Sequence, residues 1–511
     1  MKAFFDSLTR PAGRLVAALA DPARGNRAMA LALAGYVLVW TLYGVLAKGS
    51  QDINFDMGEA VAWSRELALG YPKHPPLSAW LVRAWFSLFP LTDASYYLLA
   101  MTVAGSGLWL AWLLCARWLD GEKRVVGLAL LTLVPLLNIL ALKYNVNTVM
   151  IPLWAAATLC FLRSFETRAL LWAALAGLAA TAAMLDKYWS VTLLAGLAIA
   201  ALADPRRKAY FRSAAPWITI AVGLLALAPH MAWIASHKSS TINYALNQHA
   251  AGAGTSLVKS SLAFLGGVAG YIAVPVLVAL LAARPSRAAL ADTLWPQTPD
   301  RRFALVAFVT PFLVSVAAGV LTEGEIASIW AMPGLSLLPV VLLSSPRVVL
   351  AREAASRLVA IAVAFPVLAV ALAPVIALMI HHNGVSHYAT HYRQLAAAIE
   401  GAWRETTDRP LRLVGSYTNV VNGVVFYLRD RPSTLDIMEP DMTPWADDAR
   451  VRREGVALVC PLEATDCVRV LEQRAAKSKA RHRVEVEISR LYFGVPDHPV
   501  RYLIVAVPPQ N

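Results

Sequence analysis

Residues 51–80 read QDINFDMGEAVAWSRELALGYPKHPPLSAW and follow the first strongly apolar segment of the chain, 28–47. This stretch contains four ionisable side chains close together: Asp56, Glu59, Lys73 and His74. Ionisable groups at a membrane face are costly unless they pair or bind something, so such a cluster marks a functional site by default. We therefore take this loop as the candidate site and the apolar segments around it as its scaffold.

The composition is that of a polytopic membrane protein. Of the 511 residues, 58% are hydrophobic, and the mean hydropathy is +0.53. Apolar runs of about 20 residues, enough to cross ~30 Å of hydrocarbon, recur over the first three quarters of the chain. We predict about eleven spans, at 28–47, 95–117, 125–142, 146–162, 168–185, 188–203, 213–234, 260–283, 303–321, 329–345 and 358–380. Residues 75–92 are excluded, because Pro75-Pro76 opens them and Arg83 interrupts their apolar face.

The net charge of +13 is explained by membrane orientation and not by a nucleic-acid partner. Lys and Arg gather in alternate loops, as the positive-inside rule requires. The basic loops hold Arg117, Lys123, Arg124, Arg163, Arg168, Arg206, Arg207, Lys208, Arg212, Arg284, Arg287, Arg301, Arg302, Arg347, Arg352 and Arg357. We predict a bacterial inner (plasma) membrane protein with a cytoplasmic N-terminus, a periplasmic 48–94 loop and a periplasmic C-terminal segment.

Three regions are expected. Residues 1–27 have the pattern of a basic amphipathic helix on the cytoplasmic surface, and 28–380 form the transmembrane domain. From 381 onward, strand and helix patterns alternate, which indicates a periplasmic α/β domain at 381–511. Its predicted helices are 387–405, 418–429 and 464–477, and its predicted strands are 411–415, 455–460, 482–490 and 501–507. Cys460 and Cys467 lie in this exported segment, where a disulfide is permitted.

The 48–94 loop is itself expected to be structured. Residues 57–69 give an amphipathic helix stopped by Gly70, and Pro75-Pro76 open a second helix, 75–89, with aromatic side chains at interfacial spacing. Two helices along the membrane surface would suit an enzyme that takes one substrate from lipid and another from water.

Asp56 and Glu59 admit two interpretations. An Asp N-cap followed by Glu at the third helical position stabilises a helix start, and capping alone would explain the pair. Alternatively, Asp56 is a general base that accepts the proton of an attacking hydroxyl group. The two roles are compatible.

Other polar side chains fall on loops predicted to face the same side as the 48–94 loop. Lys73, His74, Lys143 and Lys187 are candidate cations for a phosphate group, although a surface turn or snorkelling explains them equally well. Asn145 and Asn147 can bond sugar hydroxyls. The remaining candidates are Tyr188, His230, which is more often a packed helix-end histidine, and Glu325, which a solvated turn would also explain. No close-spaced ligand motif appears, so no metal or other cofactor is predicted as a requirement.

These residues resemble the dolichyl-phosphate-mannose-protein mannosyltransferase superfamily. The resemblance rests on the acidic pair, Leu69-Gly70-Tyr71, Lys73-His74-Pro75-Pro76-Leu77 and Trp80. Further blocks follow in the same order: Lys143-Tyr144-Asn145-Val146-Asn147 with Trp154, Lys187-Tyr188, and Trp330-Ala331-Met332-Pro333. Within the superfamily, the chain looks like the bacterial branch of lipid A aminoarabinose transferases and rhizobial lipopolysaccharide sugar transferases.

The resemblance implies an α-helical polytopic C-type glycosyltransferase fold and a polyprenyl-phosphate-linked sugar as donor. The acceptor would be lipid A, lipopolysaccharide or another envelope glycan, with membrane lipids around it. The catalytic acid of relatives lies in an adjacent Asp-Glu pair, whereas here two residues separate Asp56 from Glu59. We favour Asp56 as the base and Lys187, then Lys143, as the phosphate ligand.

Other functions remain open, among them a lipid-linked polymerase or ligase for surface polysaccharide and a non-catalytic membrane assembly protein. A protein O-glycosyltransferase of the same superfamily would use the same donor on a protein acceptor. A secondary transporter would show charged or helix-breaking groups at mid-span and paired repeats, and the polar groups here gather at one face instead.

Overall fold

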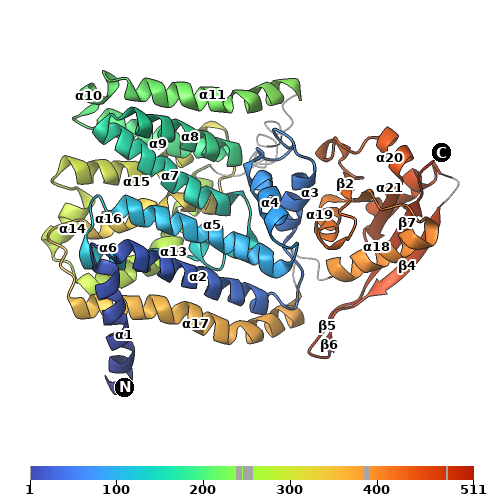
Figure 1. The fold of residues 1–511 in the computed structure, drawn as a ribbon, viewed down its shortest axis with the longest axis horizontal. Coiled ribbons are helices and arrows are strands. Elements are labelled where there is room, and N and C mark those ends of the chain that lie inside the picture. The colour runs from blue at the N-terminus through green and yellow to red at the C-terminus, as the bar shows by residue number, and fades with distance from the viewer. Residues whose placement is uncertain (1, 238–243, 245–256, 385–390, 479–480, 511) are drawn as a thin grey trace. The chain divides into compact units, whose positions relative to one another are not determined.

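The computed structural model describes residues 2–237, 244, 257–384, 391–478 and 481–510. They fall into two compact units, the first made of residues 1–42 and 98–369 and the second of residues 43–97 and 370–511 (Figure 1). The first unit is a bundle of helices. The second contains the first loop together with the C-terminal α/β domain.

Seven helices of the described chain are long and apolar enough to cross a membrane, which confirms a polytopic helical fold. They are α2 (Gly25–Ala47), α5 (Asp93–Cys115), α7 (Val146–Thr167), α11 (Ala215–Ser236), α13 (Leu257–Ala283), α15 (Pro299–Leu321) and α17 (Arg352–Asn383). Three predicted spans are shorter apolar helices: α8 (Leu170–Asp186), α9 (Val191–Ala203) and the segment of η5 (Met332–Leu337) with α16 (Leu338–Leu343). The connecting helices are α1 (Lys2–Ala20), α6 (Gly121–Leu131), α10 (Arg207–Phe211) and α14 (Arg287–Leu294).

The predicted span 125–142 is wrong as a continuous helix. Helix α6 ends at Leu131, and two single turns of 3₁₀-helix follow, η1 (Pro135–Leu137) and η2 (Ala141–Lys143). Pro135 has no N–H for an α-helical bond, and the Asn138 amide donates back to the carbonyl of Thr132 at 2.9 Å. Proline and asparagine together therefore end the helix within the apolar run.

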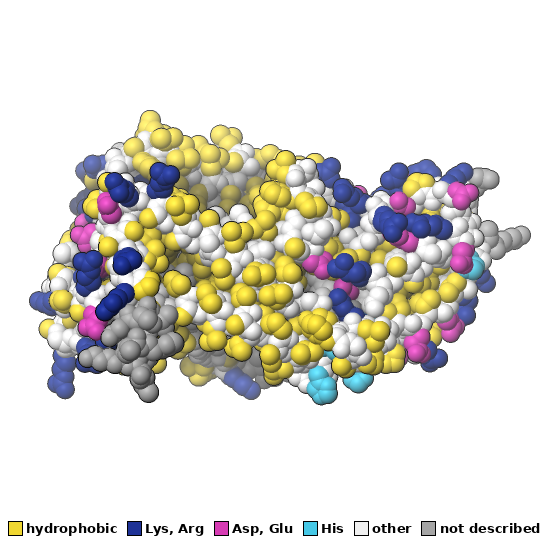
Figure 2. All heavy atoms as spheres, turned by 60° about the horizontal axis from the view of Figure 1, so that its bottom comes forward, with side chains coloured by type: hydrophobic (Ala, Val, Ile, Leu, Met, Phe, Trp, Pro, Cys, Tyr) yellow, Lys and Arg dark blue, Asp and Glu magenta, His cyan; other side chains and the backbone are white. Residues whose placement is uncertain are grey.

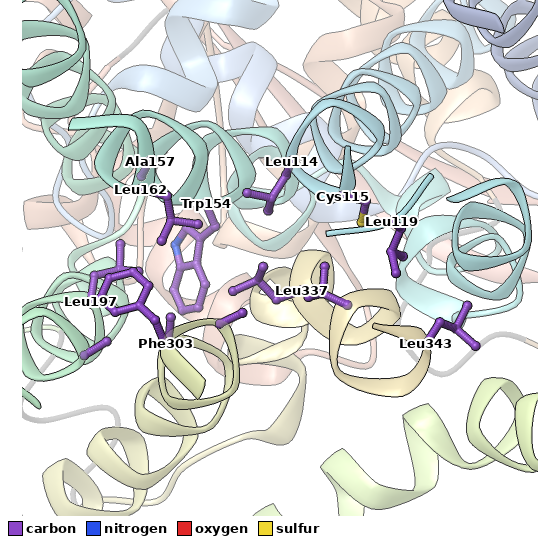
Figure 3. Packing of buried hydrophobic residues seen from close by; sticks show 14 of the residues in the cluster. Leu114, Cys115, Leu119, Trp154, Ala157, Leu162, Leu197, Phe303, Leu337 and Leu343 are labelled. Atoms are coloured by element: carbon purple, nitrogen blue, oxygen red, sulfur yellow. The ribbon is translucent and has the colours of Figure 1, made fainter. Parts of the chain in front are cut away.

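The helices of the first unit pack through clusters of buried apolar side chains. Figure 3 shows Trp154 of α7 among Leu197 of α9, Phe303 of α15 and Leu337 of η5, all in one buried cluster. The indole N–H of Trp154 donates to Ser190 Oγ at 2.8 Å. This bond fixes the short turn η3 (Tyr188–Ser190), between α8 and α9, against α7.

The loops predicted to be cytoplasmic meet at one end of the bundle. Arg117 pairs with Glu166 and Asp300, Arg206 also pairs with Asp300, and Arg352 pairs with Glu122. Figure 2 shows hydrophobic side chains over the visible face of the bundle, with Lys and Arg gathered toward the end that carries α10 and α14 in Figure 1. The predicted alternation of loops is consistent with this grouping, and the absolute orientation stays a prediction.

The second unit is built on a five-stranded mixed sheet in the order β2-β1-β3-β7-β4. Its strands are β1 (Leu413–Ser416), β2 (Ser433–Asp436), β3 (Val456–Pro461), β4 (His482–Ile488) and β7 (Val500–Val507). Strand β1 runs parallel to β2 and β3, whereas β7 is antiparallel to both of its neighbours. Helices α18 (Tyr392–Thr406) and α19 (Thr418–Tyr427) cover one face. Helices α20 (Asp448–Glu454) and α21 (Thr465–Ala475) cover the other.

The predicted α/β region is confirmed, with corrections at the level of elements. The predicted helix 387–405 starts at Tyr392 as far as the structure describes it, since 387–390 lie outside the described residues. Strand β2, helix α20 and a small hairpin of β5 (Leu491–Tyr492) and β6 (Val495–Pro496) are absent from the sequence prediction. Cys460 and Cys467 form a disulfide that joins the end of β3 to the start of α21.

Candidate functional site

The acidic residues lie on α3 (Phe55–Arg65), which α4 (Leu77–Leu88) follows. Asn54 is the N-cap, and its side-chain oxygen accepts the backbone N–H of Asp56 at 2.9 Å. Asp56 is therefore the second residue of the helix and Glu59 the fifth. The capping explanation for this pair is wrong, because a third residue supplies the cap.

Glu59 and Lys73 form an internal ion pair. The Lys73 ammonium donates to both carboxylate oxygens of Glu59, at 3.2 and 3.3 Å, and the Glu59 side chain is only 5% exposed. Lys73 also lies 5.8 Å from the centre of the Phe55 ring. Asp56, by contrast, is half-buried on the same helix. The pairing leaves Asp56 as the more accessible carboxylate of α3.

The loop between the two helices is held by aromatic packing. Tyr71 stacks on Trp63 with ring centres 5.1 Å apart, and the His74 ring approaches Trp63 edge-on at 6.1 Å. The backbone N–H of Tyr71 donates to the carbonyl of His74. Helix α3 ends at Arg65, five residues before Gly70, so the predicted stop is wrong. Arg65 and Glu66 instead contact the α/β domain: Arg65 donates to the Val425 and Pro432 carbonyls, and Glu66 accepts from Ser433.

Helix α3 packs directly on α19 of the α/β domain. A Cβ added at Gly58 would lie 2.4 Å from the backbone oxygen of Asn422, so only glycine permits this approach. The Tyr427 hydroxyl accepts the backbone N–H of Ile53 at 3.0 Å. The α/β domain thus positions the helix that carries the acidic pair.

A charged cluster fastens the start of the same loop. The buried Asp52 accepts from Arg490 at 3.0 Å and from the backbone N–H of Arg393 at 3.1 Å. Burial raises the pKa of Asp52 to about 6, against the opposing effect of Arg490. Arg393 also pairs with Asp93 at 2.6 Å.

In the helical bundle, four predicted site residues form one run of contacts. The Lys187 ammonium donates to Asn147 Oδ1 at 2.9 Å and lies 4.6 Å from the centre of the Trp330 ring. The next residue, Tyr188, hydrogen-bonds through its hydroxyl to His230 Nε2 at 2.8 Å. Asn147 is the second residue of α7, Lys187 follows the end of α8, and His230 lies near the end of α11. All three lie at the ends of these helices opposite the basic loops. The explanation that Lys187 only snorkels into solvent is therefore wrong, because its ammonium contacts the Asn147 amide and the Trp330 ring.

The other predicted residues of the bundle have different settings. Asn145 is the N-cap of α7, where its side chain accepts the backbone N–H groups of Asn147 and Thr148. Lys143 is half-buried at the end of η2. Glu325 is exposed after α15, and no bond to the run around Lys187 is seen for it in the described part of the chain. Within those residues no group of three or more His, Cys, Asp and Glu is placed to hold a metal ion.

Asp186 is a buried carboxylate to which the sequence prediction assigned no role. It is fully buried at the end of α8, and neither carboxylate oxygen has a hydrogen-bond partner among the described residues. Lys187 is the next residue along the chain. The only signal of Asp186 in the sequence is its position next to Lys187, because its burial appears only in the folded chain.

Comparisons with known proteins show which family and which fold the chain resembles. Residues 73–233 match the family model described as dolichyl-phosphate-mannose-protein mannosyltransferase. Lipid A galacturonosyltransferase RgtD from Rhizobium johnstonii is 26% identical over 213 residues. That match covers 41% of this chain and 44% of RgtD, so the chain spans less than half the length of this curated relative.

Solved structures extend the likeness to almost the whole chain. ArnT from Cupriavidus metallidurans, bound to undecaprenyl phosphate, superposes with a TM-score of 0.62 at 13% identity. The superposition covers 93% of this chain and 97% of ArnT. The apo form of the same protein gives a TM-score of 0.59. At this identity the likeness shows the fold alone. Together these matches confirm the predicted resemblance: the chain is a multi-pass membrane protein with an ArnT-like fold, related to the dolichyl-phosphate-mannose-protein mannosyltransferase family of membrane glycosyltransferases.

Proposed function

We propose that the chain is an inverting glycosyltransferase that moves a sugar from a polyprenyl-phosphate donor to a lipid A or lipopolysaccharide acceptor at the periplasmic face of the inner membrane. The observation that carries this proposal is the run of contacts Asn147–Lys187 and Tyr188–His230. All four residues lie within 73–233, the part that matches the family model.

Asp56 is the general base in this proposal. The acceptor O–H gives its proton to the Asp56 carboxylate while the oxygen forms a bond to the anomeric carbon. The bond from that carbon to the phosphate oxygen breaks, and polyprenyl phosphate leaves as the anion. Glu59 does not compete for this role, because Lys73 already neutralises it within the protein.

The residues around Lys187 hold the donor phosphate. An ammonium group in a poorly hydrated site stabilises the charge that develops on a leaving phosphate. Asn147 orients Lys187, and Tyr188 with His230 supplies hydroxyl and imidazole groups for phosphate or sugar oxygens.

The nature of the substrates is inferred from the relatives. ArnT was solved with undecaprenyl phosphate, which supports a polyprenyl-phosphate donor. RgtD is a lipid A sugar transferase, which supports a lipid A acceptor.

The test is transfer by the purified full-length chain. It is incubated in detergent with a radiolabelled undecaprenyl-phosphate sugar and lipid A, and the labelled product is separated by thin-layer chromatography. Wild-type protein should label lipid A, and Asp56→Asn should abolish labelling while remaining folded. The matched control is Asp466→Asn, which changes an exposed carboxylate on α21 and should retain full activity. Near-native turnover by Asp56→Asn would remove Asp56 from the mechanism.

A further inference from the structure

The hairpin of β5 and β6 lies outside the five-stranded sheet of the α/β domain (Figure 1). It pairs Leu491 with Pro496 and Tyr492 with Val495. Leu491 is 68% exposed and Phe493 78% exposed, and Val495 is also exposed. A two-stranded hairpin with apolar side chains in water is at best marginally stable, so these side chains need a partner.

The turn of this hairpin has an unfavourable residue at its tip. Phe493 and Gly494 both have positive φ angles, +49° and +80°. A two-residue turn with this geometry favours Asn-Gly, and a bulky side chain at positive φ is an outlier. Phe493 contacts the neighbouring Tyr492 ring at 4.7 Å and is otherwise largely exposed. Strain of this kind is associated with function.

The hairpin is fastened to the ends of two membrane-spanning helices. The carbonyl of Val495 is 2.8 Å from Nε2 of His381, near the end of α17. Tyr492 packs on the His381 ring at 5.6 Å. The guanidinium of Arg490, just before the hairpin, donates to the carbonyl of Gly49, two residues after the end of α2. The hairpin therefore lies where both spans leave the bilayer.

Apolar side chains near the end of α17, the helix whose His381 contacts the hairpin, are exposed as well. Val375 and Met379, in the last turns of α17, are 53% and 59% exposed, as expected for side chains in contact with lipid. We propose that the tip of the β5–β6 hairpin, Leu491, Phe493 and Val495, inserts into the interfacial region of the bilayer and anchors the α/β domain to lipid. Phe and Leu side chains are typical of the apolar face that an interfacial segment buries at the boundary between headgroups and acyl chains.

Spin labelling tests the anchor independently of any enzymatic activity. The full-length chain, with Cys115 and Cys160 changed to Ala, is labelled at Phe493→Cys and reconstituted into phosphatidylcholine vesicles. Collision rates of the nitroxide with oxygen, which concentrates in lipid, and with a water-soluble nickel chelate are compared. We expect oxygen to dominate at position 493. The matched control is a label at Arg409→Cys, which is exposed on the same domain, and here the nickel chelate should dominate.

A second variant separates insertion from folding. Phe493→Asn suits the turn and should leave the thermal midpoint unchanged or higher. A spin label at Leu491→Cys should collide mainly with oxygen when Phe493 is present. In the Phe493→Asn background the same label should collide mainly with the nickel chelate. Equal access of the nickel chelate to positions 493 and 409 would overturn the proposal, as would an unchanged ratio at 491 in Phe493→Asn.

Discussion

The Glu59–Lys73 ion pair gives the sharpest prediction about the acidic loop. Changing Lys73 to Met keeps the length and apolar stem of the side chain and removes its charge. Glu59, whose side chain is 5% exposed, then remains buried without its partner. Breaking a buried ion pair from one side costs about 3–5 kcal/mol, because the remaining charge is desolvated without compensation.

This free-energy cost predicts a measurable drop in the thermal midpoint of unfolding. For a unit of this size, 1 kcal/mol shifts the thermal midpoint by about 2–4 °C, so Lys73→Met should lower the midpoint by roughly 6–20 °C. Glu59→Gln in addition to Lys73→Met should recover much of the loss, since no buried charge is left. The midpoint is followed by intrinsic fluorescence of the purified protein in one detergent at pH 7.

A surface ion pair of the same domain supplies the control. Arg469 and Asp466 pair at 2.8 Å, but their side chains are 61% and 75% exposed. Arg469→Met should therefore cost at most about 1 kcal/mol. The reasoning is refuted if Lys73→Met behaves like Arg469→Met, or if the double variant is no more stable than Lys73→Met alone.

Two further predictions follow from other contacts. Gly58→Ala should lower both the thermal midpoint and the rate of sugar transfer, because the added Cβ would collide with the backbone of Asn422. Gly35→Ala is the control and should change neither, because a Cβ there meets nothing within 4 Å. Equal effects of the two changes would contradict the packing argument. The pKa of Asp52 in the folded state, about 6, lies above its ordinary value of 3.8, so protonation of Asp52 favours the folded state. The stability of wild type relative to Asp52→Asn should therefore drop by up to ~3 kcal/mol as the pH rises from 4 to 7. A stability difference that does not change with pH would exclude this linkage.

The sequence predicted the parts of the fold that depend on local patterns. Long apolar runs identified the major spans, and period-two and period-3.6 patterns identified most of the α/β domain. Pro135 was a local signal that the 125–142 run is broken, and the hydrophobicity of that run obscured it. The Phe493-Gly494 turn escaped notice, because the usual hairpin signal is Asn-Gly.

The sequence predicted which residues belong to the candidate site. It did not predict which of them contact one another. Lys73 is 14 residues from Glu59, and Lys187 is 40 from Asn147. No periodicity links side chains at such separations, so only the folded chain shows that Lys73 neutralises Glu59. Asn54 is a residue type that often caps a helix N-terminus, but Asp56, two residues later, is an equally good N-cap candidate. Asp186 was passed over because its burial is a tertiary property.

The most direct test of the proposed transfer is mass spectrometry of envelope glycolipids from cells that make either the wild-type chain or Asp56→Asn at equal levels in the membrane. We predict that one lipid A or lipopolysaccharide species gains the mass of a single sugar residue in cells with the wild-type chain and not in cells with Asp56→Asn. Identical glycolipid profiles from the two strains, or the same sugar addition with Asp56→Asn, would contradict it.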